Sequence, residues 1–231
     1  LAAADRTIGA AAKTAGTLEA ADPWTDAWLA TTRAARSLHA GEIGPYLEGT
    51  AAAIRAYDAA GDVRHACNQR VRLGYGYVEV GDLPRAEEEL RAALQQAERL
   101  GVPLVAGYAL QNLGWVRALR GDAKEGRALE ERALALGQRL GNPGLEGGAR
   151  FYLGQIARAA GDAAAAVAQG EAALHAVESI PPLRTLCLAA LARALRLAGR
   201  GEEALARARE ASDARGTLAS MEEGEALVWL A

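Results

Sequence analysis

Apolar residues recur three and four positions apart in segments of about 14 to 18 residues, which is the spacing of one face of an α-helix. The stretch after Asp82 shows this register, with Leu83, Ala86, Leu90 and Ala97 on one face. Glycines separate the segments, and glycine is favoured just past a helix end. All seven prolines fall at expected helix starts, where proline is tolerated. The pattern predicts an all-helical chain.

The glycine punctuation repeats every 40 residues. Two series show this step: Gly41, Gly81, Gly121 and Gly161, and then Gly74, Gly114 and Gly154. The acidic residue after each glycine of the first series suits a helix N-cap. Each 40-residue unit is therefore expected to hold two helices, an A helix and a B helix. The expected units cover residues 24–60, 62–100, 102–140, 144–178 and 182–213, with half repeats at 1–20 and 219–231.

Three residue pairs recur in a fixed order within these units. They are Leu73-Gly74, Gly81-Asp82 and Ala93-Leu94, and again Leu153-Gly154, Gly161-Asp162 and Ala173-Leu174. This order resembles the tetratricopeptide repeat, lengthened from its usual period of about 34 residues as in variants from bacterial signalling and regulatory proteins. The resemblance implies an all-α, right-handed αα superhelix of about five helix pairs, forming a single domain. The small residues would let paired helices approach closely.

Composition narrows the classes of partner. Hydrophobic residues make up 51% of the 231 residues, largely alanine, and the net charge is −3. The sequence shows no excess of basic residues of the kind that binds nucleic acid or an anionic membrane surface. It also has no run of about 18 apolar residues that would suggest a membrane-spanning helix. Lysine is scarce relative to arginine, which is typical of proteins from GC-rich bacterial genomes. We also expect a cytoplasmic protein. The chain starts without methionine and ends on an apolar run, so we expect a fragment of a longer protein.

Catalytic and metal-binding motifs are not recognisable. Ala12-Lys13-Thr14 lacks the glycine of a phosphate loop. The three histidines fall on different repeats without ligand spacing, and Cys67 and Cys187 are expected to be buried thiols without a redox role. We therefore expect no enzymatic activity, no metal and no cofactor. The acidic runs Glu87–Glu89 and Glu130-Glu131 are expected to be solvated helix faces, paired with nearby arginines.

The resemblance also implies where a partner binds. In that family the A helices line a concave groove. Three positions of each A helix usually face it: the residue directly after the A-helix glycine, the residue three before that glycine and the residue six before it. Carried onto this sequence, these positions give the candidates Asn68, Tyr75, Tyr108, Gln111, Trp115, Phe151, Gln155 and Arg193. The weaker first repeat adds Trp28 and Thr31, whereas Tyr77 and Tyr152 are expected to pack between helices. The Lys, Asn and Arg clamp with which some members hold acidic tails is not reproduced.

Aromatic rings flanked by amides suit an extended peptide, because rings supply contact area and amides pair with its backbone. We therefore expect a protein- or peptide-binding scaffold that uses the groove, with no nucleic acid and no membrane as partner. One alternative is that some of these rings only fill the space between A helices. A second is a regulatory or self-association module of a larger bacterial kinase, ATPase or transcription regulator, joined through its ends. A third is a small-ligand sensor.

Overall fold

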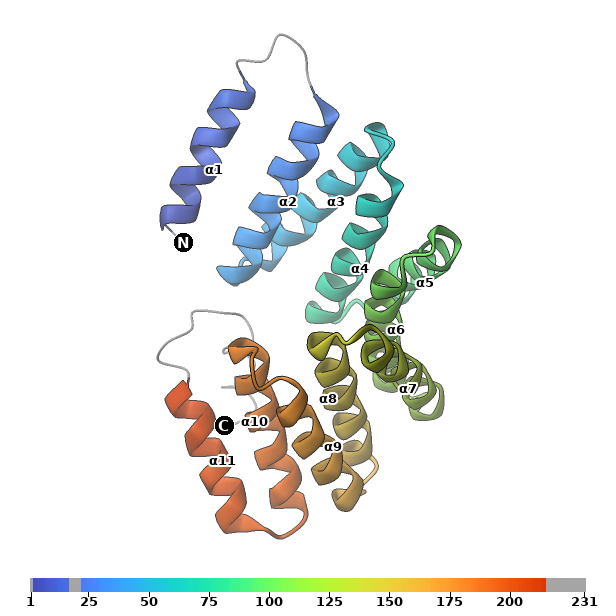
Figure 1. Cartoon of the computed structure of the whole chain (residues 1–231), viewed down its shortest axis with the longest axis vertical. Helices are drawn as coiled ribbons and strands as arrows, with labels where there is room; N and C mark the ends of the chain where they lie inside the picture. The colour runs from blue at the N-terminus through green and yellow to red at the C-terminus, as the bar shows by residue number, and fades with distance from the viewer. Residues whose placement is uncertain (1, 17–21, 215–231) are drawn as a thin grey trace. The chain divides into compact units, whose positions relative to one another are not determined.

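A computed structural model describes residues 2–16 and 22–214 of the chain. Within these residues the chain forms eleven α-helices and no strand (Figure 1). The helices are α1 (Ala2–Ala15), α2 (Pro23–His39), α3 (Ile43–Ala59), α4 (Val63–Glu79), α5 (Leu83–Leu100), α6 (Pro103–Leu119), α7 (Ala123–Leu140), α8 (Pro143–Ala159), α9 (Ala163–Ala176), α10 (Pro181–Leu197) and α11 (Gly201–Ala214). The expected half repeat at 219–231 lies outside the described residues.

The helix ends follow the glycine and aspartate punctuation. Eight glycines between described helices adopt positive φ values of 59° to 94°, and they include Gly41, Gly81, Gly121 and Gly161 of the 40-residue series. Aspartates at four helix starts accept a hydrogen bond from a backbone N–H three residues on, at 3.0 to 3.2 Å. The helix α9 has 14 residues, whereas α5 and α7, which precede it in the same position of their units, have 18. This shortening accounts for the contracted last spacing before Gly199.

The chain divides into two compact units, Leu1–Asn112 and Leu113–Ala231, whose boundary falls within α6. In the first unit α2 packs on α3, α3 on α4, and α4 on α5. Tyr46 and Tyr57 fill its core and are almost fully buried. A Cβ added at Gly74 would lie 2.5 Å from Cγ of Leu90. The expected close approach of paired A and B helices is therefore confirmed at this position.

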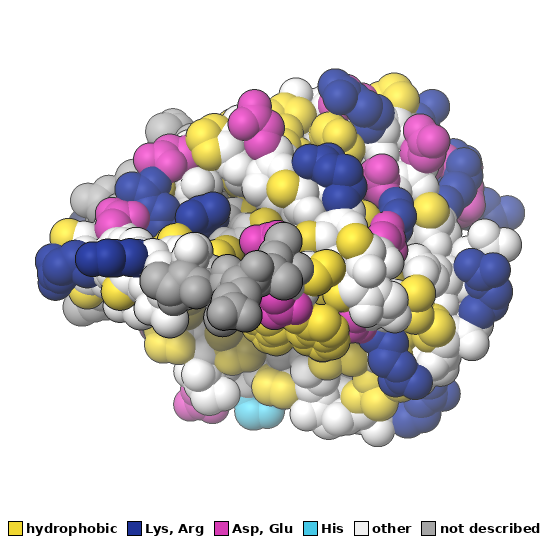
Figure 2. Space-filling view, turned by 90° about the horizontal axis from the view of Figure 1, so that it is seen from above, with side chains coloured by type: hydrophobic (Ala, Val, Ile, Leu, Met, Phe, Trp, Pro, Cys, Tyr) yellow, Lys and Arg dark blue, Asp and Glu magenta, His cyan; other side chains and the backbone are white. Residues whose placement is uncertain are grey.

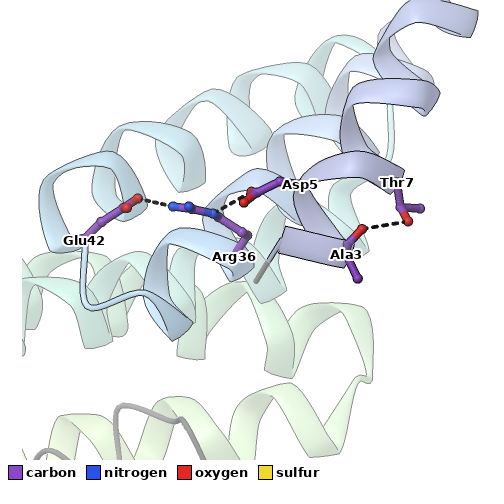
Figure 3. Close-up of polar contacts among 5 residues, drawn as sticks. All are labelled: Ala3, Asp5, Thr7, Arg36 and Glu42. Atoms are coloured by element: carbon purple, nitrogen blue, oxygen red, sulfur yellow. Dashed lines mark hydrogen bonds and ion pairs between the residues drawn. The ribbon is translucent and has the colours of Figure 1, made fainter.

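The first helix, α1, is joined to α2 by an ion pair (Figure 3). Arg36 of α2 donates from Nε to the Asp5 carboxylate at 2.8 Å and from a second nitrogen to Glu42 at 2.5 Å. Arg36 thus connects α1 to the residue that precedes α3. Because these side chains are partly exposed, solvent screens the pair, and its main effect is on helix position.

In the second unit α7 packs on α8, α8 on α9, and α10 on α8, α9 and α11. The buried leucines Leu188, Leu191 and Leu195 make α10 the central helix of this packing. A Cβ added at Gly126 would lie 2.7 Å from the Gly114 carbonyl oxygen, so α6 and α7 approach closely. At Gly154 the nearest such atom is 3.5 Å away, an ordinary contact, so this glycine is not needed for close packing.

The acidic runs are not solvated throughout, and this expectation was wrong at two positions. Glu87 is buried, although it forms the expected ion pair with Arg91 at 2.6 Å. Glu130 is 0% exposed, and neither of its carboxylate oxygens accepts a hydrogen bond among the described residues. Its side chain faces Gly114, as Leu90 faces Gly74 one period earlier. Glu130 therefore occupies a core position, and burial raises its pKa well above the usual value.

Both cysteines are free and buried, as expected. The Cys67 thiol donates to the Ala93 carbonyl oxygen at 3.3 Å. Burial raises the pKa of Cys67, and it raises the pKa of Cys187 to about 12. These thiols are thus held in the protonated, unreactive form. Among the helices described, none has the length and apolarity needed to cross a membrane.

Candidate binding surfaces on the A helices

The A helices are α2, α4, α6, α8 and α10, and they carry every candidate residue of the predicted groove. The candidates form two sets, because the unit boundary follows Asn112. The first-unit set is Asn68, Tyr75, Tyr108 and Gln111. The second-unit set is Trp115, Phe151, Gln155 and Arg193.

Exposure separates the candidates by their register on the A helix. Five candidates lie either six residues before or one residue after the A-helix glycine or its equivalent, and all five are half-buried. They are Asn68, Tyr75, Tyr108, Trp115 and Arg193. The position three residues before that glycine is buried in the three repeats that carry the glycine, at Val71, Gln111 and Phe151. Gln155 is also buried, at 2% exposure. On each unit taken by itself, a partner on the A helices would therefore meet the half-buried side chains first: Asn68, Tyr75 and Tyr108 on the first, Trp115 and Arg193 on the second.

In the first-unit set, Tyr108 lies beside the neighbouring A helix. Burial raises the pKa of its phenol, and the positive charge of Arg72 on α4 acts in the opposite direction. Arg72 itself is exposed, and its carbonyl oxygen accepts a 2.8 Å hydrogen bond from the Tyr46 hydroxyl. The surface around Tyr108 thus combines a half-buried ring with an exposed guanidinium.

The second-unit set is organised around Tyr152, which the sequence assigned to packing between helices. Trp115 stacks on the Tyr152 ring with centroids 5.2 Å apart and an interplanar angle of 22°. Phe151 meets the same ring edge-on at 5.1 Å. The structure therefore brings Trp115 and Phe151 together through a third, half-buried ring. Tyr77 is half-buried too, with the Arg85 guanidinium carbon 4.7 Å from its ring centroid.

Arginines gather where α8 and α10 meet. The buried amide oxygen of Gln155 accepts a 3.1 Å hydrogen bond from Nε of Arg158. Burial lowers the pKa of Arg193, and the neighbouring charges of Arg158 and Arg196 lower it further. Of these arginines, Arg158 also lines a small crevice, together with Phe151, Gly154, Gln155, Cys187, Ala190 and Ala194 among others. This end of the second unit carries locally concentrated positive charge.

One aromatic cluster was not predicted as a cluster. Trp24 and Trp28 of α2 surround Tyr57 of α3 and His65 of α4, with centroids 5.6 to 6.3 Å apart. Tyr57 and His65 stack at 5.2 Å and 22°. The repeat register had selected Trp28 alone. The four-residue spacing of the two tryptophans was the signal that pointed to a shared surface.

Charge on the visible surface is mixed. On the face in Figure 2, Lys and Arg side chains are interspersed with Asp and Glu side chains and with hydrophobic ones. In the portion of the chain that the structure describes, no group of three or more His, Cys, Asp or Glu side chains is arranged to hold a metal ion.

Comparison with known proteins concerns the fold. No family model matches the chain, and no curated protein matches its sequence. Among solved structures, BtubC (BKLC) from P. vanneervenii matches 93% of this chain and 89% of its own, with 18% identity and a TM-score of 0.67. The TPR-like repeats of a putative kinesin light chain from Podosopora anserina match 79% and 91%, at 17% identity and a TM-score of 0.56.

A third structure is the Rap conjugation gene regulator of plasmid pLS20 in complex with the Phr* peptide. It matches 87% of this chain at 14% identity, with a TM-score of 0.74. The chain has the fold of tetratricopeptide-like repeat proteins. It spans about half, 55%, of the Rap regulator's length. The TPR-like repeat predicted from the glycine series is thereby confirmed as a fold.

Proposed function

We propose that this chain is a protein- or peptide-binding TPR-like scaffold, and that its partner binds along the face of the A helices. The observation that carries the proposal is the half-buried state of aromatic and amide side chains on successive A helices. Asn68, Tyr75 and Tyr108 lie on one unit, and Trp115 lies on the other. Rings that keep part of their surface in solvent retain apolar area that a partner can bury.

The packing of Trp115 supports its role. Its stacking on Tyr152 holds the indole in one orientation while the ring stays half-buried. A side chain held in place before binding loses little conformational freedom when a partner docks, so more of its contact energy appears as affinity. Gln111, Phe151 and Gln155 are buried, and we assign them the supporting role of fixing their exposed neighbours.

The fold comparison supports a peptide as the partner. The Rap regulator is similar to this chain in fold, and its structure holds a peptide. Because a shared fold does not transfer a ligand, the peptide assignment here rests equally on the aromatic and amide chemistry of the A helices.

The proposal is tested with peptides selected on the chain from a random library of extended peptides. We expect Tyr75→Ala and Trp115→Ala each to weaken binding of the selected peptides at least about tenfold, the loss of roughly 1.4 kcal/mol that marks an anchoring side chain. Leu140→Ala is the matched control, since Leu140 is exposed on a B helix. Circular dichroism checks that helicity is kept. Equal affinities for the wild type and both aromatic variants would contradict the proposal.

A regulatory or self-association module of a larger protein is the alternative. It is favoured by two exposed leucines in the last described helix pair, Leu197 and Leu205. Sedimentation velocity distinguishes the two functions. Self-association predicts a mass that rises with concentration and that falls to the monomer in Leu205→Glu, whereas a monomer at all concentrations would exclude it.

A further inference from the structure

A crevice opens in the second unit because one B-helix side chain is missing. In the earlier repeats a side chain of the following B helix covers the A-helix glycine, as Leu90 covers Gly74. Two periods after Leu90 the chain has Gly170, which offers no side chain to Gly154. A Cβ added at Gly154 would accordingly meet no atom nearer than 3.5 Å. Gly154 and Gly170 both line the space that remains.

This space, here called the Arg158 crevice, is lined by residues of α8, α9 and α10, all within the second unit. Its enclosed part is about 10 Å³, which is roughly the room that one water molecule or one ligand oxygen needs. The lining is apolar except at Gln155, Arg158 and the protonated thiol of Cys187. The crevice therefore admits a small group and offers it few polar contacts.

The polar contacts on offer are hydrogen-bond donors. The Gln155 amide oxygen accepts a 3.1 Å hydrogen bond from Nε of Arg158. Because arginine can only donate, this bond identifies the amide oxygen and leaves the Gln155 amide N–H groups and the two terminal nitrogens of Arg158. Gln155 is 2% exposed and holds the half-buried guanidinium in place. A ligand atom that satisfies these groups must be an acceptor.

Positive charge is concentrated around Arg158. Burial lowers the pKa of Arg193 on α10, and the like charges of Arg158 and Arg196 lower it further, so both charges reach Arg193. Neither Arg158 nor Arg196 forms an ion pair within the part of the chain that the structure describes. Elsewhere in the second unit arginines do pair with glutamate, at Arg150, Arg184, Arg200 and Arg207. An anion beside Arg158 offsets the repulsion within this group.

We propose that the Arg158 crevice binds the carboxylate of an acidic side chain, aspartate or glutamate, of the protein or peptide partner. This rests on the proposed function, since it specifies the chemistry of the partner. One carboxylate oxygen enters the crevice beside Gln155, and the terminal nitrogens of Arg158 donate to the carboxylate in a charge-assisted pair. An apolar side chain is a poorer occupant, because it would bury these donors without an acceptor.

The test uses a tri-glutamate peptide as the probe and a tri-glutamine peptide as its neutral counterpart of nearly the same shape. Both ends of each peptide are blocked, so that only side-chain carboxylates are offered. The readout is the Nε–H resonances of chain labelled with ¹⁵N-arginine at physiological salt, with Arg158 assigned through Arg158→Lys. We expect tri-glutamate to shift the Arg158 resonance saturably, with little effect on Arg127 of α7. Equal shifts from tri-glutamine, or no saturable shift from tri-glutamate, would overturn the proposal.

Variants test the guanidinium and the crevice separately. Arg158→Gln is expected to weaken tri-glutamate binding about five- to tenfold, as for the loss of one charge-assisted hydrogen bond. The charge-matched control is Arg127→Gln, because Arg127 is exposed on a B helix of the same unit. An affinity that falls equally in both variants would show a general charge effect and would contradict the assignment.

Gly154→Ala places a methyl group in the crevice without a close contact to other atoms. Because the enclosed part holds about one water-sized group, we expect this variant to weaken tri-glutamate binding at least about threefold while circular dichroism shows unchanged helicity. Full affinity in Gly154→Ala would show that the carboxylate does not enter the crevice.

The outcome is separable from that of the proposed function. If tri-glutamate does not bind while Tyr75→Ala and Trp115→Ala still weaken selected peptides, the carboxylate site fails and the scaffold function stands. If tri-glutamate binds at Arg158 while those two variants have no effect, the carboxylate site stands and the assignment of the A-helix aromatic residues fails.

Discussion

Replacement of Glu130 by leucine is expected to stabilise the second unit. Glu130 is fully buried against Gly114, and its carboxylate oxygens accept no hydrogen bond within the described chain. One period earlier Leu90, also fully buried, faces Gly74 in the same way. Leucine therefore fits this position, and Glu130→Leu exchanges a desolvated carboxyl group for apolar packing.

The size of the effect follows from two contributions. Burying a leucine side chain is worth about 1.5–3 kcal/mol, and replacing a buried charged group by a well-packed apolar one gains about 1–4 kcal/mol in comparable cases. We expect Glu130→Leu to raise the free energy of unfolding at neutral pH by about 1–4 kcal/mol. For a chain of this length each kcal/mol corresponds to roughly 2–4 °C in Tm.

The pH dependence has a definite sign. Burial raises the pKa of Glu130 well above its usual value of 4.5 in the folded state. The folded state thus binds this proton more tightly than the unfolded state does. The contribution of this proton to the free energy of unfolding is complete below about pH 4.5 and is lost as the pH rises through the pKa of the folded state. The free energy of unfolding then falls by at most about 1.4 kcal/mol per pH unit.

The assay is urea unfolding of the wild type, Glu130→Leu and the exposed neighbour variant Glu131→Leu at pH 5, 6, 7 and 8. Hydrogen exchange of α7 amides gives a local readout, because repeat arrays can open unit by unit. The advantage of Glu130→Leu over the wild type should grow with pH, whereas Glu131→Leu should change little. An advantage that is constant with pH, or a loss of stability at pH 8, would refute the buried-carboxyl reasoning.

Two further changes test the packing of the paired helices and the state of the thiols. Gly74→Ala should destabilise the chain by about 1–3 kcal/mol, because its Cβ would lie 2.5 Å from Cγ of Leu90. Gly154→Ala, whose added Cβ would meet no atom nearer than 3.5 Å, should be neutral or stabilise the chain by up to about 1 kcal/mol. Thermal unfolding of the two variants measures the difference, and equal destabilisation would contradict the difference in packing. Cys67 and Cys187 should react with a disulfide reagent at pH 8 only after unfolding, since burial raises the pKa of both; rapid reaction of native chain would show that they are accessible.

Helix positions could be predicted because the residues that end helices act locally. A glycine that must adopt positive φ and an aspartate that caps the next helix mark the same boundary whatever the partner helix is. Gly81 with Asp82, and Gly121 with Asp122, did so to within a residue. Prolines added an independent mark at the helix starts.

Side-chain environments were less predictable, because they depend on the neighbouring helix. A Glu-Glu pair on a helix reads as a solvated face, yet Glu130 is buried. Alignment at the 40-residue period places Glu130 with Leu90 and Gly170, neither of which is charged, and this was the available signal. Both of those residues are buried in the structure. The repeat register indicated that Tyr152 packs between helices, but it did not identify Trp115, which lies on another helix, as the ring that stacks on it.

The binding of a partner on the A helices is tested most directly by mapping a selected peptide on ¹⁵N-labelled chain. We expect the largest saturable shift changes at Asn68, Tyr75, Tyr108 and Trp115. Shift changes confined to the B helices α3, α5, α7 and α9, with these four residues unaffected, would contradict it.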